Sequence, residues 1–173
     1  MKTKASASVL ALVLAIAFSL QSCGEPPVIN APEPQGDPYK ENMINANKTI
    51  NSAEQTQIEN YIARRGWQMR QLDNGSWIEE TVQGKGAKVD WEDTLTVRYR
   101  LEALNGAVIY HQQEETFVVG QNKPTVGLDR GVMELRRGSE ARLIVPSSLG
   151  YGVVGDGDRV PARTVLVYIL TIT

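Results

Sequence analysis

The segment LTVRYRL at residues 95–101 alternates apolar and polar side chains over its whole length. Successive side chains of a β-strand point to opposite faces of a sheet, so this alternation predicts a strand with one buried and one exposed face. Asn105-Gly106 follows shortly afterwards and is typical of a tight turn. We therefore expect the chain to return as a strand over residues 107–110, and to form another over residues 116–119.

Further strands are expected on both sides of this pair. Residues 67–72 and 77–82 flank the turn sequence Asp73-Asn74-Gly75-Ser76 and predict a hairpin. Residues 141–145 predict a strand that ends at Pro146. Residues 164–173 are apolar on both faces, as expected for a strand in the middle of a sheet.

One short helix is expected among these strands. Leu128, Val132 and Leu135 recur at helical spacing, and Gly138 is expected to close the helix. The fold class is therefore α+β, with an antiparallel sheet of roughly five or six strands.

Residues 39–66 are expected to form a helical extension before the sheet. Ser52 to Gln55 fits a capping box, Ile58, Tyr61 and Ile62 follow at helical spacing, and Gly66 suits the end of a helix. The upstream residues either extend this helix or fray. Two roles stay open: a surface helix that packs on its own domain, or an arm for dimerisation or partner docking.

The N-terminus has the features of a targeting signal. Residues 1–22 combine two lysines with an apolar run that is too short for a membrane span, which predicts a secretory signal peptide. Leu20-Gln21-Ser22-Cys23 resembles a bacterial lipobox, so Cys23 is the expected site of lipidation. The alternative is an ordinary signal with an incidental cysteine. The Pro-rich segment 23–38 then predicts an extended tether.

Composition excludes several classes of function. The 173 residues are 42% hydrophobic and 22% charged, which is typical of a globular chain. With 18 Lys and Arg against 20 Asp and Glu there is no basic excess for nucleic-acid binding. The single cysteine and the single histidine, His111, exclude an internal disulfide and a multi-histidine metal site. We expect neither a metal nor a cofactor.

Within residues 67–173, the stretch 89–173 resembles an FKBP-type peptidyl-prolyl isomerase domain. The matching segments, in the family's order, are VRY (97–99), LNG (104–106), GLDRGV (127–132), LRRG (135–138), IVPSSLGYG (144–152) and VPARTVLVY (160–168). The helical extension and the Trp67 hairpin are similar to those of gliding-motility-associated FKBP lipoproteins. The resemblance implies a twisted antiparallel sheet wrapped around one short helix, with a proline-binding groove between them.

The resemblance also implies the site. Tyr99 matches a groove-wall tyrosine, Tyr151 the tyrosine whose hydroxyl binds a substrate carbonyl, and Tyr168 stands where the family has a wall phenylalanine. These three are the predicted catalytic residues. The predicted substrate-binding residues are Ile109, Tyr110, Thr125, Leu128 and Val160.

Several of these positions depart from the family pattern. Ile109 replaces a phenylalanine, Tyr110 replaces an aspartate that accepts hydrogen bonds inside the groove, and Leu128 replaces the tryptophan that floors it. Pro124-Thr125 replaces a Val-Ile pair whose backbone holds the ligand. Glu115 falls about where another phenylalanine is expected. Each lost aromatic surface is expected to reduce binding by about 1 kcal/mol or more.

The resemblance therefore implies a membrane-anchored isomerase in the cell envelope, facing the periplasm or the surface. Its partners would be proline-containing exported polypeptides and, through the lipid, a membrane. The alternative is a catalytically weak chaperone or docking module of an envelope complex, such as a gliding or secretion apparatus.

Overall fold

The structure, a computed structural model, describes residues 38–173. The chain divides into two units, residues 1–38 and 39–173. The predicted signal peptide, the lipidated Cys23 and all of the tether except its last residue lie outside the described residues. Among the described helices, none combines the length and the apolarity needed to cross a membrane.

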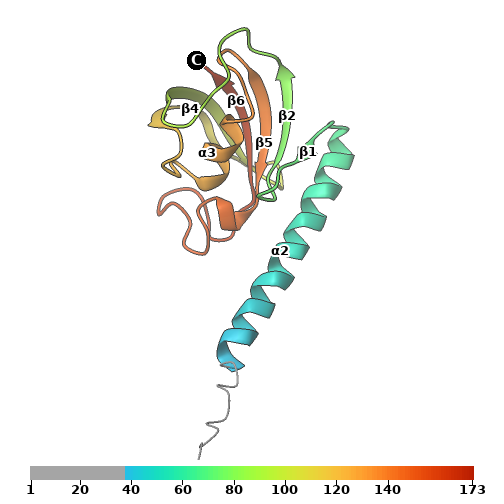
Figure 1. Ribbon diagram of the computed structural model, residues 1–173. Coiled ribbons are helices and arrows are strands. Elements are labelled where there is room, and N and C mark those ends of the chain that lie inside the picture. The colour runs from blue at the N-terminus through green and yellow to red at the C-terminus, as the bar shows by residue number, and fades with distance from the viewer. Residues whose placement is uncertain (1–37) are drawn as a thin grey trace, which may run out of the picture. The chain divides into compact units, whose positions relative to one another are not determined.

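Six antiparallel strands form one sheet in the order β1-β2-β5-β6-β3-β4. The strands are β1 (Arg70–Gln71), β2 (Trp77–Val82), β3 (Thr94–Ala103), β4 (Val108–Val118), β5 (Glu140–Val145) and β6 (Leu166–Ile172). Figure 1 shows them curving around the short helix α3 (Val126–Val132). The α+β architecture predicted from the sequence is therefore confirmed.

Strand β6 lies between β5 and β3, as its sequence predicts. Leu166 and Tyr168 face the core on the α3 side of the sheet, whereas Val165 and Val167 belong to the core cluster on the α2 side. A strand between two packed layers must be apolar on both faces. The double-sided run of residues 164–173 follows from this position.

Two expected strands differ in extent. Only Arg70 and Gln71 of residues 67–72 pair with β2, so the first strand is shorter than predicted. The sequence predicts separate strands over residues 107–110 and 116–119, but residues 108–110 and 116–118 belong to one continuous strand, β4. A register shift in the pairing of β3 with β4 lets the chain continue through residues 111–115.

Helix α3 packs closely on β5 through its glycines. A Cβ on Gly127 would lie 2.2 Å from Cγ1 of Val145, and one on Gly131 would lie 2.8 Å from the side chain of Leu143. Only glycine permits this approach of a helix to a sheet. The helix ends at Val132, and Gly138 (φ +83°) instead forms the turn before β5, so the prediction that Gly138 closes the helix is wrong.

Helix α2 (Pro38–Arg65) begins well before the start that the predicted capping box indicates. Ser52 lies in the helix interior, so its assignment as the N-cap is wrong. The helix ends as predicted at Gly66, which has φ +65° and donates its N–H to Ala63 at 3.2 Å.

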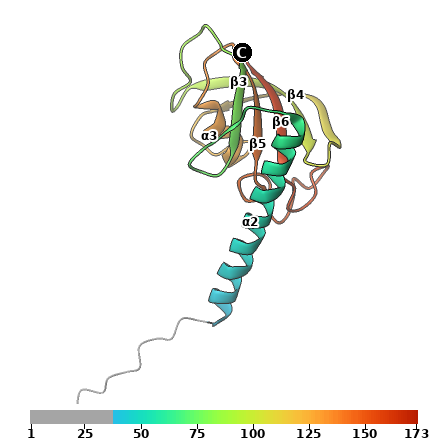
Figure 2. The ribbon, with the colours of Figure 1, turned by 90° about the vertical axis from the view of Figure 1, so that its right-hand side faces the viewer.

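The last turns of α2 cover the sheet face opposite α3 (Figure 2). Ile58, Tyr61 and Ile62 are buried there against Ile144 and other apolar residues of β5 and β6. Full burial of an isoleucine side chain contributes about 1.5–3 kcal/mol. These contacts fix the C-terminal part of the helix to the domain.

Candidate functional site

The predicted site residues gather on the α3 side of the sheet. Seven of them belong to one core cluster or pack against it: Tyr99, Leu128, Val160, Tyr168, Ile109, Tyr110 and Tyr151. The eighth, Thr125, places its hydroxyl 3.3 Å from that of Tyr168. The structure therefore brings together residues from β3, β4, β6, α3 and the loop after β5.

Tyr99 and Tyr168 lie on neighbouring strands and form an edge-to-face pair. Their ring centroids are 5.2 Å apart at an interplanar angle of 68°. Tyr168 is fully buried, and burial raises its pKa above the ordinary tyrosine value. Because Tyr168 has no exposed surface, in this conformation it supports Tyr99 from within the core.

The hydroxyl of Tyr99 donates a hydrogen bond of 2.8 Å to Oε1 of Glu115. Burial, followed by this hydrogen bond and the charge of Glu115, raises the pKa of Tyr99. The phenol therefore stays protonated and keeps a fixed orientation. The family resemblance matches Glu115 to a phenylalanine position and does not predict this bond.

A hydrogen bond from Tyr110 connects β4 to the loop that contains Val160. Its hydroxyl donates to Oδ2 of Asp156 at 2.7 Å, and the guanidinium of Arg159 lies 5.4 Å from the centre of its ring. The bond to Asp156 raises the pKa of Tyr110 to about 12. Tyr110 itself remains half-buried, with part of its ring accessible.

Asp156 organises this loop through its other oxygen. Oδ1 accepts the backbone N–H groups of Asp158, Arg159 and Val160 at 2.9, 2.9 and 2.7 Å. Desolvation acts to raise the pKa of Asp156, but the hydrogen bonds from Tyr110 and the backbone outweigh it and lower the pKa. Val160, the predicted loop residue of the groove, is buried beneath this turn.

Helix α3 supplies the base of the site. Thr125 is the N-cap of α3, and its hydroxyl accepts the N–H of Leu128 at 3.3 Å. Leu128 is completely buried. Its side chain belongs to the core in this conformation, at the position where the resemblance predicts a groove floor.

Tyr151 follows the 3₁₀ turn η1 (Ser147–Leu149). It is half-buried, and burial raises its pKa, with the charges of Glu115 and Asp156 adding to the effect. Within residues 38–173 its hydroxyl has no hydrogen-bond partner. Among the described residues of this cluster, this phenol is therefore a hydroxyl that is available for a further hydrogen bond.

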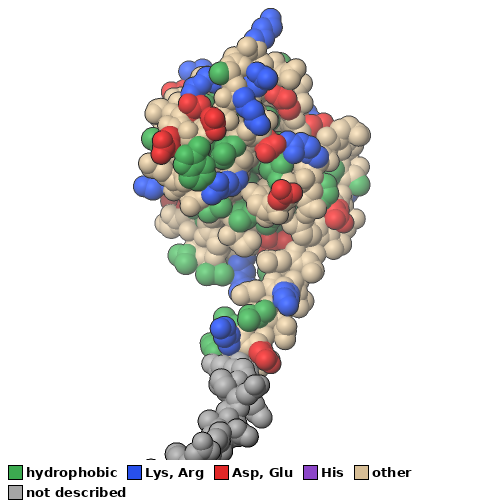
Figure 3. Space-filling view, in the orientation of Figure 1, with side chains coloured by type: hydrophobic (Ala, Val, Ile, Leu, Met, Phe, Trp, Pro, Cys, Tyr) green, Lys and Arg blue, Asp and Glu red, His purple; other side chains and the backbone are tan. Residues whose placement is uncertain are grey.

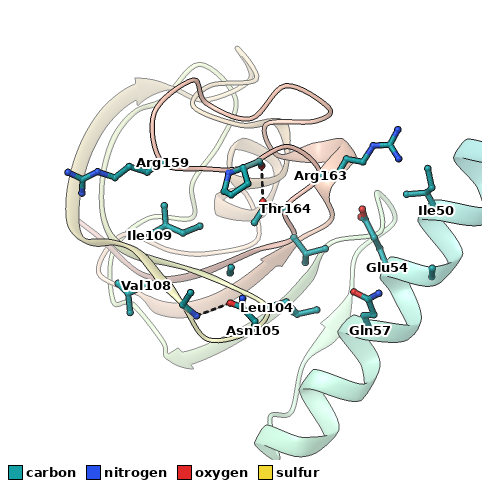
Figure 4. A pocket seen from close by; sticks show the side chains of 15 residues that line it. Ile50, Glu54, Gln57, Leu104, Asn105, Val108, Ile109, Arg159, Arg163 and Thr164 are labelled. Carbon is teal, nitrogen blue, oxygen red and sulfur yellow. Dashed lines mark hydrogen bonds between the residues drawn. The ribbon is translucent and has the colours of Figure 1, made fainter.

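A groove that the sequence did not indicate lies between α2 and the β3–β4 turn and has a volume of about 770 Å³. Ile50, Glu54 and Gln57 of α2 line one side, and the β3–β4 turn with Val108 and Ile109 lines another (Figure 4). Its remaining lining residues include Arg159, Pro161 and residues 163–165. Ile109 therefore contributes to both places.

Metal binding has no candidate in the described part of the chain. Across residues 38–173, no three His, Cys, Asp or Glu side chains are grouped so that they could hold an ion.

Comparison with known proteins agrees with this fold. Residues 85–173 match the FKBP-type peptidyl-prolyl cis-trans isomerase family. A relative from Neisseria meningitidis, described as a probable FKBP-type peptidyl-prolyl cis-trans isomerase FkpA, is 33% identical over 99 residues, which are 55% of this chain and 36% of the relative. Peptidyl-prolyl cis-trans isomerase FKBP53 of Arabidopsis thaliana is 32% identical over 107 residues, 58% of this chain and 22% of the relative. The chain thus spans well under two thirds of these relatives.

Solved structures show the same fold. The crystal structure of a peptidyl-prolyl cis-trans isomerase from Pseudomonas syringae has a TM-score of 0.60 and 26% identity, covering 72% of this chain and 92% of that one. AtFKBP13, at 21% identity and a TM-score of 0.55, supports the fold alone. The family model, the relatives and the sheet wrapped around α3 agree, and the chain belongs to the FKBP-type peptidyl-prolyl cis-trans isomerase family of enzymes.

Proposed function

We propose that this chain catalyses cis–trans isomerisation of Xaa–Pro bonds in polypeptides that bind on the α3 side of its sheet. The observation that carries the proposal is the arrangement of Tyr99, Glu115 and Tyr151. One phenol is held by a carboxylate, and the other presents a hydroxyl that has no hydrogen-bond partner among residues 38–173, beside apolar side chains.

The chemistry requires no nucleophile. An Xaa–Pro amide is planar because of resonance, and rotation meets a barrier of about 18–20 kcal/mol. The twisted amide loses resonance and has a less polar carbonyl. An apolar surface therefore favours the twisted state over the planar one, which is selective binding of the transition state.

The predicted site residues have different roles in this process. Ile109 and the ring of Tyr110 provide apolar surface for the proline, and Tyr151 donates its hydroxyl to a substrate carbonyl. The backbone of Thr125 holds the neighbouring peptide unit. Tyr168 and Leu128 support these groups from the core, where they are fully buried.

Glu115 supplies a carboxylate that accepts a hydrogen bond at the site, although the family's aspartate is replaced here. Tyr110 occupies the position of the family's aspartate, but the carboxylate of Glu115 receives the hydrogen bond from Tyr99 instead. The site therefore has a carboxylate acceptor, although at a different position from the family's aspartate. This supports catalysis despite the substitutions.

The accessible aromatic surface is smaller than in the family pattern. Leu128 and Tyr168 are buried, and Ile109 carries no ring. Aromatic contacts contribute about 0.5–1.5 kcal/mol beyond their buried area. We therefore expect weak binding of short peptides.

We also propose that the protein acts in the cell envelope, anchored by lipid at Cys23, on exported polypeptides. The support is the lipobox-like segment Leu20–Cys23 after a short apolar run. Two or more acyl chains give stable membrane attachment. Incorporation of a labelled fatty acid into the wild type but not into Cys23→Ser tests the anchor, and equal labelling would contradict it.

A second candidate function is docking, and two observations favour it. The 770 Å³ groove beside α2 is bordered by Arg159 and Arg163. The first turns of α2 expose apolar side chains, with Met43 49% and Ile44 43% exposed (Figure 3). A partner segment with apolar and acidic side chains fits these features.

Refolding kinetics separate the two functions. A reporter protein whose refolding is limited by prolyl isomerisation should refold faster with catalytic amounts of residues 23–173. Tyr151→Phe should reduce the acceleration. A rate that rises only at stoichiometric protein, equally for both variants, would support docking and contradict catalysis.

A further inference from the structure

A buried carboxylate connects α2 to the segment that holds Tyr151. Glu54 accepts hydrogen bonds from the backbone N–H of Ser147, at 2.9 Å, and from the Ser147 hydroxyl. Glu54 is 7% exposed and Ser147 5% exposed. The two residues are 93 positions apart in the sequence, so this contact depends entirely on the packing of the helix.

Ser147 in turn holds the backbone on both sides of Tyr151. Its carbonyl accepts the N–H of Gly152 at 2.9 Å and also accepts that of Gly150 at 3.2 Å, which Gly150 shares with the carbonyl of Pro146 at 3.1 Å. Gly152 has φ +63°, a conformation that glycine adopts without strain. Glu54 therefore fixes Ser147, the first residue of a turn that contains Tyr151 and that ends with the hydrogen bond from Gly152 to Ser147.

A carboxylate in this place requires a reason, because burying a charge is unfavourable unless the charge is hydrogen-bonded. Glu54 lies on the face of α2 that borders the 770 Å³ groove, as Figure 4 shows. An apolar side chain would avoid this cost but could not accept hydrogen bonds from Ser147. What only a hydrogen-bond acceptor provides is a fixed position for Ser147.

We propose that Glu54 is a positioning residue for Tyr151, so that helix α2 contributes to the geometry of the isomerase site. This inference rests on the proposed function for its catalytic consequence. Its structural part concerns the turn from Ser147 to Gly152 and can be measured independently of activity.

The chain offers a matched control on the next residue. Gln55 also ties α2 to the sheet: it donates to the carbonyl of Gly75 at 2.9 Å and accepts from Nε1 of Trp77 at 3.0 Å. These bonds lead to the β1–β2 hairpin and not to Ser147. Gln55→Ala therefore weakens the attachment of α2 without touching the Tyr151 turn.

The test compares Glu54→Ala, Glu54→Gln and Gln55→Ala in residues 23–173. Amide hydrogen exchange at Gly150 and Gly152 should become about tenfold faster in Glu54→Ala, because Ser147 loses its buried acceptor. The value of kcat/KM should fall as well. Glu54→Gln keeps one acceptor oxygen, so it should retain most of the protection from exchange and most of kcat/KM. Gln55→Ala should match the wild type in exchange at these amides.

Two results would overturn the proposal: unchanged exchange at Gly150 and Gly152 in Glu54→Ala, or equal loosening in Gln55→Ala. If Glu54→Ala does not fold, Ser147→Ala replaces it, because it removes the hydroxyl that donates to Glu54. Exchange at Gly150 and Gly152 should then be faster in Ser147→Ala than in Glu54→Gln, and equal exchange in the two variants would overturn the proposal. A wild type without isomerase activity would contradict the proposed function, while hydrogen exchange would still decide whether Glu54 positions the turn.

Discussion

The hydroxyl of Tyr99 on β3 donates a 2.8 Å hydrogen bond to the carboxylate of Glu115 on β4. Tyr110, five residues earlier on β4, packs on the same core as Tyr99. In a regular strand, residues five apart point to opposite faces. The pairing of Tyr99 with Gln113 and of Leu101 with Tyr110 inserts one extra residue in β4, and this bulge brings Glu115 to the side of the site.

The first prediction concerns this pair. Glu115→Gln removes the charge from the acceptor, and hydrogen bonds to charged groups contribute about 1.5–3 kcal/mol. We expect kcat/KM for a proline peptide to fall about tenfold or more. Glu114→Gln is the control, because Glu114 pairs with Arg98 on the exposed side of the same strands. Equal effects of the two substitutions would contradict a specific role for Glu115.

The second prediction concerns the free phenol of Tyr151. Because its hydroxyl has no partner in the described part of the chain, Tyr151→Phe should leave the melting temperature nearly unchanged. Activity should fall by up to about tenfold, through loss of one hydrogen bond to the substrate. Thermal denaturation and peptide kinetics measure both. A variant that unfolds would show that Tyr151 is a structural residue.

The third prediction concerns alkaline pH. Tyr110 should titrate at about 12, because Asp156 accepts its hydrogen bond. An unfolded tyrosine titrates at about 10, so between pH 10 and 12 the unfolded state has lost a proton that the folded state keeps. Stability should therefore fall with rising pH across this interval.

Ultraviolet titration of the wild type against Tyr110→Phe isolates this phenol. Asp156→Asn should move its pKa down towards the ordinary value. If Tyr110 titrated near 10 in the wild type, the bond between β4 and the loop at Asp156 would not exist in solution.

The fourth prediction concerns the contact of α3 with β5. Gly127→Ala places a methyl group 2.2 Å from Cγ1 of Val145, a β-branched side chain that cannot rotate away freely. Overpacking of this kind costs about 1–3 kcal/mol. Gly131→Ala meets the more flexible Leu143 at 2.8 Å and should cost less. Urea denaturation of both variants gives the order, and the reverse order would contradict this packing.

Much of the sheet could be predicted because its local patterns agree with its packing. The alternation of residues 95–101 and the two-sided apolar run of residues 164–173 both follow from the layers that cover each strand. The gathering of Tyr99, Tyr151 and Tyr168 followed from the family resemblance. These tyrosines lie on three of the segments that match the family in sequence order, at residues 97–99, 144–152 and 160–168.

The rest depended on contacts between distant segments. Ser52 to Gln55 has the pattern of a helix start, but the helix continues upstream, and Glu54 and Gln55 use their side chains to bind Ser147, Gly75 and Trp77. The bulge in β4 leaves no mark in the spacing of apolar residues, so the partner of Tyr99 could not be predicted.

Exchange spectroscopy tests the central claim most directly. The cis and trans proline signals of a short Xaa–Pro peptide exchange too slowly, over tens of seconds, to show cross-peaks without a catalyst. With residues 23–173 at substoichiometric concentration, cis–trans cross-peaks should appear, and they should weaken with Glu115→Gln and with Tyr151→Phe. Unchanged cis–trans exchange, even at stoichiometric wild-type protein, would contradict catalysis at this site.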